Sequence, residues 1–168
     1  MVRKRRNKFL ALNKALNVYR READKCEQCR AFLAGCMLQG ALLEACLTLM
    51  ALVYREEVSK TNAFQAVKKR VEKNWKRHVR WLRDFDPRDL EKIAIELSWC
   101  SGLEHELKSL RDVRNLIHPG KYADEIGKRK AVNNRYYQSQ YKRLLRITDK
   151  LYDKLIQSLT IAWREGRL

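Results

Sequence analysis

Residues 31–53 read AFLAGCMLQGALLEACLTLMALV, an almost wholly apolar run as long as a long helix. A helix that is apolar on all sides lies either at the centre of a bundle or across a bilayer, for which about 20 apolar residues suffice. Gln39 and Glu44 interrupt the run, and a carboxylate at the middle of a membrane costs about 2.5–3.5 kcal/mol on insertion scales. We therefore expect the central helix of a bundle, with a membrane-associated helical protein as the weaker alternative. The small residues of the run predict close helix–helix approach, either within the bundle or across a dimer.

The composition of the whole chain also favours an all-α protein. Only 6 glycines and 2 prolines occur in 168 residues, which favours long helices over a turn-rich sheet. The length and the 45% hydrophobic content fit one domain with a real core. We expect residues 1–168 to form a single helical domain. Within it, residues 1–24 would form a basic N-terminal helix and residues 25–165 an antiparallel bundle of about four to six helices.

Helical spacing of apolar residues predicts where the helices lie. The expected helices cover residues 7–24, 24–57, 64–83, 87–100, 103–117 and 132–165, with a linker over 58–63. Asp86 followed by Pro87 gives the clearest boundary, because aspartate is a preferred N-cap and proline fits the first turn. Ser101 and Gly102 are expected to break the chain before the next helix.

Net charge is the strongest sign of function. The chain has 37 Lys and Arg against 20 Asp and Glu, a formal charge of +17. Such an excess is self-repulsive unless a polyanion relieves it, and nucleic acid is the commonest polyanion, followed by anionic membrane. We expect RNA as the partner and no membrane.

The cysteines predict a compartment rather than a site. Their number, five, is odd, and no secretory signal is visible, so we expect free thiols in a reducing, cytoplasmic environment. Cys26 and Cys29 form one CxxC pair, but the other cysteines are scattered, unlike the two pairs of a zinc site. We expect no metal and no other cofactor.

The expected helix over residues 64–83 carries most of the candidate RNA contacts. Its apolar stripe places Trp75 in the core, whereas Trp81 lies off the stripe and is expected to be exposed. Basic residues beside an exposed tryptophan suit single-stranded RNA, although a solvated helix face explains the same pattern without a ligand. The candidate RNA-binding residues are Lys68, Lys69, Arg70, Lys73, Lys76, Arg77, Arg80, Trp81 and Arg83.

A second cluster lies at the end of the expected helix over residues 103–117. Arg111, Arg114 and His118 are spaced to share one helical face. Arginine binds phosphate through a fixed fork of donors, and histidine transfers protons near neutral pH. Since the sequence has no acidic cluster for magnesium, cleavage here would be metal-free: the RNA 2′-hydroxyl attacks the neighbouring phosphate, His118 moves a proton, and arginine stabilises the added charge. The His118-Pro119-Gly120 sequence is also an ordinary helix stop, which needs no chemistry.

Residues 110–119, LRDVRNLIHP, resemble the HEPN superfamily of all-helical proteins, whose signature is an arginine, usually followed by a polar residue, and then a histidine after four to six intervening residues; six residues separate Arg111 from His118. The resemblance implies a bundle that dimerises through its motif helices and forms a composite cleft. It places Arg111 and His118 as the catalytic pair, Asp112 as the polar neighbour, and Arg114 and Asn115 as supporting residues. Active members are metal-independent endoribonucleases of toxin–antitoxin, antiviral defence and RNA-processing systems, and others only bind RNA, nucleotides or proteins.

These observations together lead to the following hypothesis. The chain is expected to be a cytoplasmic homodimer that binds RNA and acts as a metal-independent endoribonuclease at the dimer interface. A non-catalytic RNA- or protein-binding module of the same fold is the alternative. An antitoxin or another protein is a further expected partner.

Overall fold

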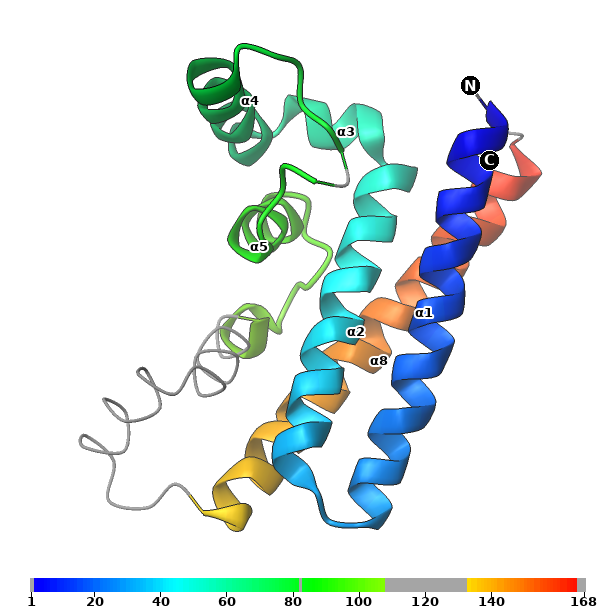
Figure 1. Cartoon of the computed structure of the whole chain (residues 1–168), viewed down its shortest axis with the longest axis vertical. Coiled ribbons are helices and arrows are strands. Elements are labelled where there is room, and N and C mark those ends of the chain that lie inside the picture. The colour runs from blue at the N-terminus through cyan, green and yellow to red at the C-terminus, as the bar shows by residue number, and fades with distance from the viewer. Residues whose placement is uncertain (1, 82, 108–132, 166–168) are drawn as a thin grey trace.

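The computed structural model describes residues 2–81, 83–107 and 133–165, which are mostly helical and contain no strand (Figure 1). The expected all-α class is confirmed. The helices whose two ends both lie within the described residues are α1 (Val2–Gln28), α2 (Phe32–Val53), α3 (Arg55–Lys60), α4 (Asn62–Trp75), α5 (Pro87–Glu96) and α8 (Asn134–Arg164).

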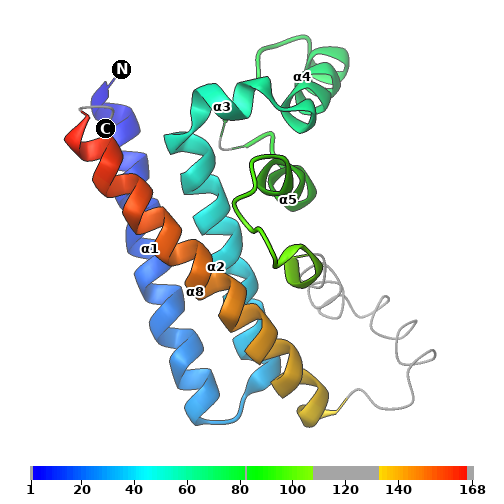
Figure 2. The same ribbon diagram turned by 180° about the vertical axis from the view of Figure 1, so that it is seen from behind.

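The long helices α1, α2 and α8 form the main bundle of the protein. α2 packs against both others, and α1 runs antiparallel to them, while α8 ascends in the same direction as α2 at an incline (Figures 1 and 2). The N-terminal end of α1 and the C-terminal end of α8 therefore lie at the same end of the bundle. The apolar run of residues 31–53 is α2, whose Leu42, Leu43, Leu47 and Met50 are buried in the core.

A glycine permits the close contact between α2 and α8. A Cβ atom added to Gly35 would lie 2.8 Å from two carbons of the Tyr141 ring, and the Tyr141 side chain is fully buried. No larger side chain fits at this position without a shift of the ring or the helix. The close helix approach predicted from the small residues is thus confirmed at Gly35, within one chain.

Among the described helices, α2 is long and apolar enough to cross a membrane. In its most apolar window of 18 residues, 61% of the residues are buried against the rest of the chain. The core helix of a soluble protein combines the same length and composition with this kind of burial.

Helices α3, α4 and α5 form a separate corner beside the C-terminal half of α2, as both views show (Figures 1 and 2). We call residues 55–96, apart from residue 82, the α3–α5 corner. The predicted start of α5 is confirmed: the Asp86 side chain accepts a hydrogen bond from the Asp89 N–H at 2.9 Å, and the Asp89 side chain accepts one from the Asp86 N–H at 3.0 Å. Glu96 at the other end of α5 accepts hydrogen bonds from the first N–H groups of α4, those of Asn62 and Ala63.

The predicted helix over residues 24–57 is wrong. α1 continues to Gln28, the chain turns through residues 29–31, and a further break at Tyr54 separates α2 from α3. Arg30 in the turn has a φ of 55°, a left-handed conformation that usually requires glycine. The predicted linker over residues 58–63 is also wrong, because α3 extends to Lys60 and only Thr61 separates it from α4.

The predicted helix over residues 64–83 ends too late. α4 stops at Trp75, and Lys76 caps it in the left-handed region with a φ of 47°. The helix predicted over residues 87–100 also extends too far. α5 ends at Glu96, and Ser98 beyond it has a left-handed φ of 54°. By contrast, the prediction over residues 132–165 closely matches α8.

Candidate nucleic-acid interface

The predicted catalytic motif lies outside the described residues. This holds for Arg111 and His118 and for their supporting neighbours Asp112, Arg114 and Asn115. Of the helix expected over residues 103–117, only residues 103–107 are described, and 104–107 are helical. The catalytic pair therefore stays a prediction, and the basic segment over residues 68–83 is the candidate site whose geometry is known.

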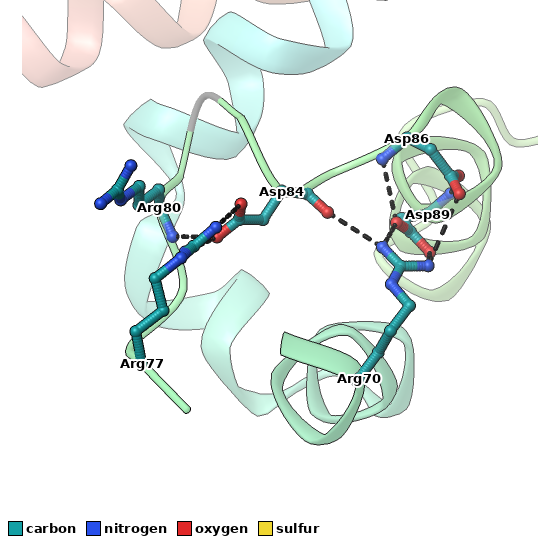
Figure 3. Close-up of polar contacts among 6 residues, drawn as sticks. All are labelled: Arg70, Arg77, Arg80, Asp84, Asp86 and Asp89. Atoms are coloured by element: carbon teal, nitrogen blue, oxygen red, sulfur yellow. Dashed lines mark hydrogen bonds and ion pairs between the residues drawn. The ribbon is translucent and has the colours of Figure 1, made fainter. Parts of the chain in front are cut away.

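One arginine of this segment is held by a buried carboxylate. Arg77 donates from Nη1 to Asp84 Oδ2 at 2.6 Å and from Nη2 to Asp84 Oδ1 at 2.7 Å, and the Arg80 backbone N–H also donates to Asp84 Oδ2 (Figure 3). The Asp84 side chain is only 3% exposed. The hydrogen bond from Arg77 is the main cause that lowers the Asp84 pKa to about 2, against the smaller opposing effect of burial. Arg77 and Asp84 thus fix the loop that follows α4.

A second arginine joins α4 to the start of α5. Arg70 Nη2 lies 2.6 Å from Asp89 Oδ2 and 2.9 Å from the Asp84 carbonyl oxygen, and Nη1 lies 3.5 Å from Asp86 Oδ2 (Figure 3). The hydrogen bond to Asp89 is the main cause that raises the Arg70 pKa. Arg70 and Arg77, both predicted as RNA contacts, have guanidinium groups committed to carboxylates, so we assign them a structural role.

The predicted roles of the two tryptophans are reversed in the structure. Trp81, expected to be exposed, is partly buried: its ring stacks on Phe64 at a centroid distance of 5.1 Å, and the Arg55 guanidinium lies 4.6 Å from its centroid. Trp75, expected in the core, is 55% exposed. For Trp81 the expectation fails because α4 ends at Trp75, so helical spacing does not extend to residue 81. Trp75 follows Val67 and Val71 on the apolar stripe of α4, but it is the last residue of the helix and the stripe is no longer covered there.

The cations of the segment that lack an ion-pair partner among the described residues are exposed. Lys68 lies 4.0 Å from Glu72, one helical turn away, and this contact is weak. The Arg80 side chain points away from Asp84 (Figure 3). We call the following exposed residues the α4 cationic surface: Lys69, Lys73, Lys76, Arg80 and Arg83. The sequence analysis missed Trp75 as an exposed residue and assigned it to the core. The helix ends there because Lys76 has a left-handed backbone, and no residue type in this part of the sequence indicates such an end.

The cysteines show no metal-binding arrangement in the described part of the chain. No group of three or more Cys, His, Asp or Glu residues gathers there in a way that could hold an ion. Cys36, Cys46 and Cys100 are buried, and burial raises their pKa values to about 12, 12 and 11. These three side chains act as small apolar residues of the core, as thiols in apolar surroundings do.

Comparisons with known proteins give no relative of this chain. No family model matches it, and neither the curated proteins nor the solved structures contain a significant match.

Proposed function

We propose that this protein binds RNA through the α4 cationic surface. The observation that supports the proposal is that some cations of the α3–α5 corner are paired with carboxylates, whereas those of the α4 cationic surface face solvent. The two buried carboxylates of the corner, Asp84 and Asp89, are paired with Arg77 and Arg70. The other cations of the segment are left facing solvent on a chain of net charge +17. A polyanion relieves such a charge excess, and its phosphates match exposed Lys and Arg side chains.

A pair of charge-matched variants tests this proposal. Lys69→Gln/Lys73→Gln removes two charges from the α4 cationic surface, and Lys142→Gln/Arg146→Gln removes two exposed charges from α8. Affinity for a fluorescent 12-nucleotide RNA is measured by anisotropy at several salt concentrations. The α4 variant should weaken binding and reduce the slope of log K against log salt by about 1.4, or about 0.7 for each single-strand phosphate contact. The α8 variant should change neither quantity. Equal losses in the two variants would show that net charge, not this surface, drives binding.

We further propose that the chain is a HEPN-like homodimer that cleaves RNA without a metal. The proposal rests on the Arg111 and His118 spacing and on the signature over residues 110–119. In this mechanism the RNA 2′-hydroxyl loses its proton and attacks the adjacent phosphorus, the P–O5′ bond breaks, and the leaving 5′-oxygen takes up a proton, which gives a 2′,3′-cyclic phosphate and a 5′-hydroxyl. His118 takes or gives one of these protons, and Arg111 stabilises the negative charge of the transition state.

Cleavage is tested with RNA and purified protein in EDTA. The expected products carry 2′,3′-cyclic phosphate ends and disappear in His118→Ala. His78→Ala and His105→Ala are the controls, because both histidines are exposed and lie outside the motif. Cleavage that requires magnesium, or that survives in His118→Ala, contradicts the mechanism. RNA binding with no cleavage in the wild-type protein would favour the non-catalytic module instead.

A further inference from the structure

Trp75 is an aromatic side chain that lies outside the packed aromatic rings of the α3–α5 corner. The other large aromatic rings of the corner, Phe64, Trp81 and Phe85, contact one another at centroid distances of 5.1–6.0 Å. Trp75 contributes to none of these ring contacts and has 55% of its surface exposed. Keeping an indole in water loses the stabilisation that burial of its apolar surface would give. An exposed ring in a corner where the other rings are packed is therefore a candidate for ligand contact.

The position of this ring is fixed by its neighbours. Trp75 is the last residue of α4, and the next residue, Lys76, has a left-handed backbone. The Arg77 guanidinium lies 5.1 Å from the centroid of the Trp75 ring. The same guanidinium is held by two hydrogen bonds to Asp84, whose side chain is buried. Asp84 thus holds Arg77 in place, and Arg77 restricts the motion of the Trp75 indole in the free protein. A side chain that is already ordered loses less conformational entropy when a ligand binds.

Three further cations, Lys73, Lys76 and Arg80, lie within five residues of Trp75 along the chain. Lys73 lies within the same last turns of α4, Lys76 follows Trp75 directly, and Arg80 points outward from the loop. Proteins that bind single-stranded nucleic acid combine cations that contact the backbone with aromatic rings on which bases stack. In a duplex each base face is already stacked on its neighbours. An acidic protein or a lipid headgroup would use the cations but has no need of an ordered aromatic ring.

We propose that Trp75 is a stacking platform for an unpaired base of single-stranded RNA, with Lys73, Lys76 and Arg80 contacting the adjacent phosphates. The inference rests on the proposed RNA-binding function and adds the class of ligand and the residue that recognises it. Arg77 and Asp84 are positioning residues in this proposal: they orient the ring and do not contact the ligand.

The test compares base-dependent and base-independent binding in the full chain. Three probes are used: a single-stranded oligouridine of 12 nucleotides, an abasic oligoribose phosphate of the same length and charge, and a 12-base-pair RNA duplex. Wild-type protein should bind oligouridine at least about 5-fold more tightly than the abasic probe, as expected for one stacked base. Trp75→Leu should abolish this preference and leave abasic binding unchanged. Trp75→Phe should restore part of the preference, because phenylalanine keeps a stacking face.

Trp163→Leu is the matched control, since Trp163 is 70% exposed but lies in the last turn of α8. It should leave all three affinities unchanged, and circular dichroism should show native helix content in each variant. Equal binding of oligouridine and the abasic probe, with a loss in Lys69→Gln/Lys73→Gln, would overturn the stacking proposal and leave the RNA-binding function intact. No binding of any probe would instead overturn the proposed function. Binding to anionic phosphatidylserine vesicles that is lost in Trp75→Leu, without base dependence, would assign the surface to membranes and overturn the proposal.

Discussion

The bundle of α1, α2 and α8 and the α3–α5 corner are stabilised by different interactions. The bundle buries long rows of apolar side chains, such as Leu43 and Met50 on α2 and Ile147 and Leu151 on α8. The corner contributes fewer buried apolar side chains, such as Phe64 and Ile93, to the same core, and it is also held by helix caps and by the ion pairs of Arg70 and Arg77. We therefore expect that removal of a surface charge changes the stability of the bundle little, whereas removal of a buried carboxylate disturbs the conformation of the corner. The α4 cationic surface belongs to the corner, so its conformation depends on these ion pairs.

The largest expected effect comes from a cavity in the bundle. Leu43 is fully buried, and Leu43→Ala should lower the free energy of unfolding by about 2–5 kcal/mol. Urea denaturation followed by circular dichroism measures the loss. Leu33→Ala is the control on the same helix, because Leu33 is 40% exposed and should cost no more than about 0.5 kcal/mol. Similar losses in the two variants would refute the assignment of α2 as the core helix.

A smaller loss is expected when the buried carboxylate of the corner is removed. Asp84→Asn breaks the charged pair with Arg77 and weakens the bond from the Arg80 N–H, at an expected cost of about 1–3 kcal/mol. The loss should be concentrated in the corner. Hydrogen exchange should therefore speed up in residues 62–96 and change little in the bundle. A uniform change over both regions would show that the corner is not a separate unit.

The same carboxylate predicts how the corner responds to acid. The Asp84 pKa is lowered from 3.8 to about 2 in the folded protein, so the folded state favours the ionised form. Its contribution to stability is present above pH 3.8 and is lost as the pH falls towards 2. Between pH 4 and pH 2 the wild type should lose more stability than Asp84→Asn does. Parallel curves of stability against pH for the two proteins would contradict this.

Sequence reasoning predicted the helices best where the boundary is local. Asp86 and Pro87 start α5 by their own chemistry, and the apolar periodicity of α8 needs no other part of the chain. It failed where a helix ends in a left-handed residue that is not glycine, at Arg30 and Lys76. Nothing in those residue types signals the end of a helix, so the helical spacing was extended too far and Trp75 was placed in the core. Arg77 pairs with Asp84 because the loop after α4 brings the two side chains together. A continuous helix over residues 64–83 does not contain this loop, so the expected helix did not predict the ion pair.

The cap of α5 should contribute less than the buried ion pair. Asp86→Ala removes the side-chain bond to the Asp89 N–H and the longer contact with Arg70, at a cost of about 1 kcal/mol. Thermal denaturation measures the change, and Asp86→Asn should recover most of it because asparagine is an equally good N-cap. If Asp86→Asn is as damaging as Asp86→Ala, the contact with Arg70 matters more than the cap.

The smallest effect is expected at an ion pair of the bundle, and it should have the opposite dependence on pH. Arg20 Nη2 lies 3.4 Å from Asp149 Oδ1, and both side chains are nearly half exposed. The Asp149 pKa is raised, mainly by burial against the bundle, with Asp153 and Asp24 adding to the effect and Arg20 opposing it. The folded state therefore favours protonated Asp149, and this contribution to stability is lost as the pH rises through the folded-state pKa. Asp149→Asn should raise the free energy of unfolding at pH 7 by less than about 0.5 kcal/mol.

Urea denaturation at pH 7 and pH 3 tests the sign of this pH dependence. Relative to wild type, the free energy of unfolding of Asp149→Asn should be higher at pH 7 than at pH 3. For Asp84→Asn the same difference from wild type should be lower at pH 7 than at pH 3. A shared sign would mean that the two regions use their carboxylates in the same way, and the distinction between an apolar bundle and a charge-dependent corner would fail.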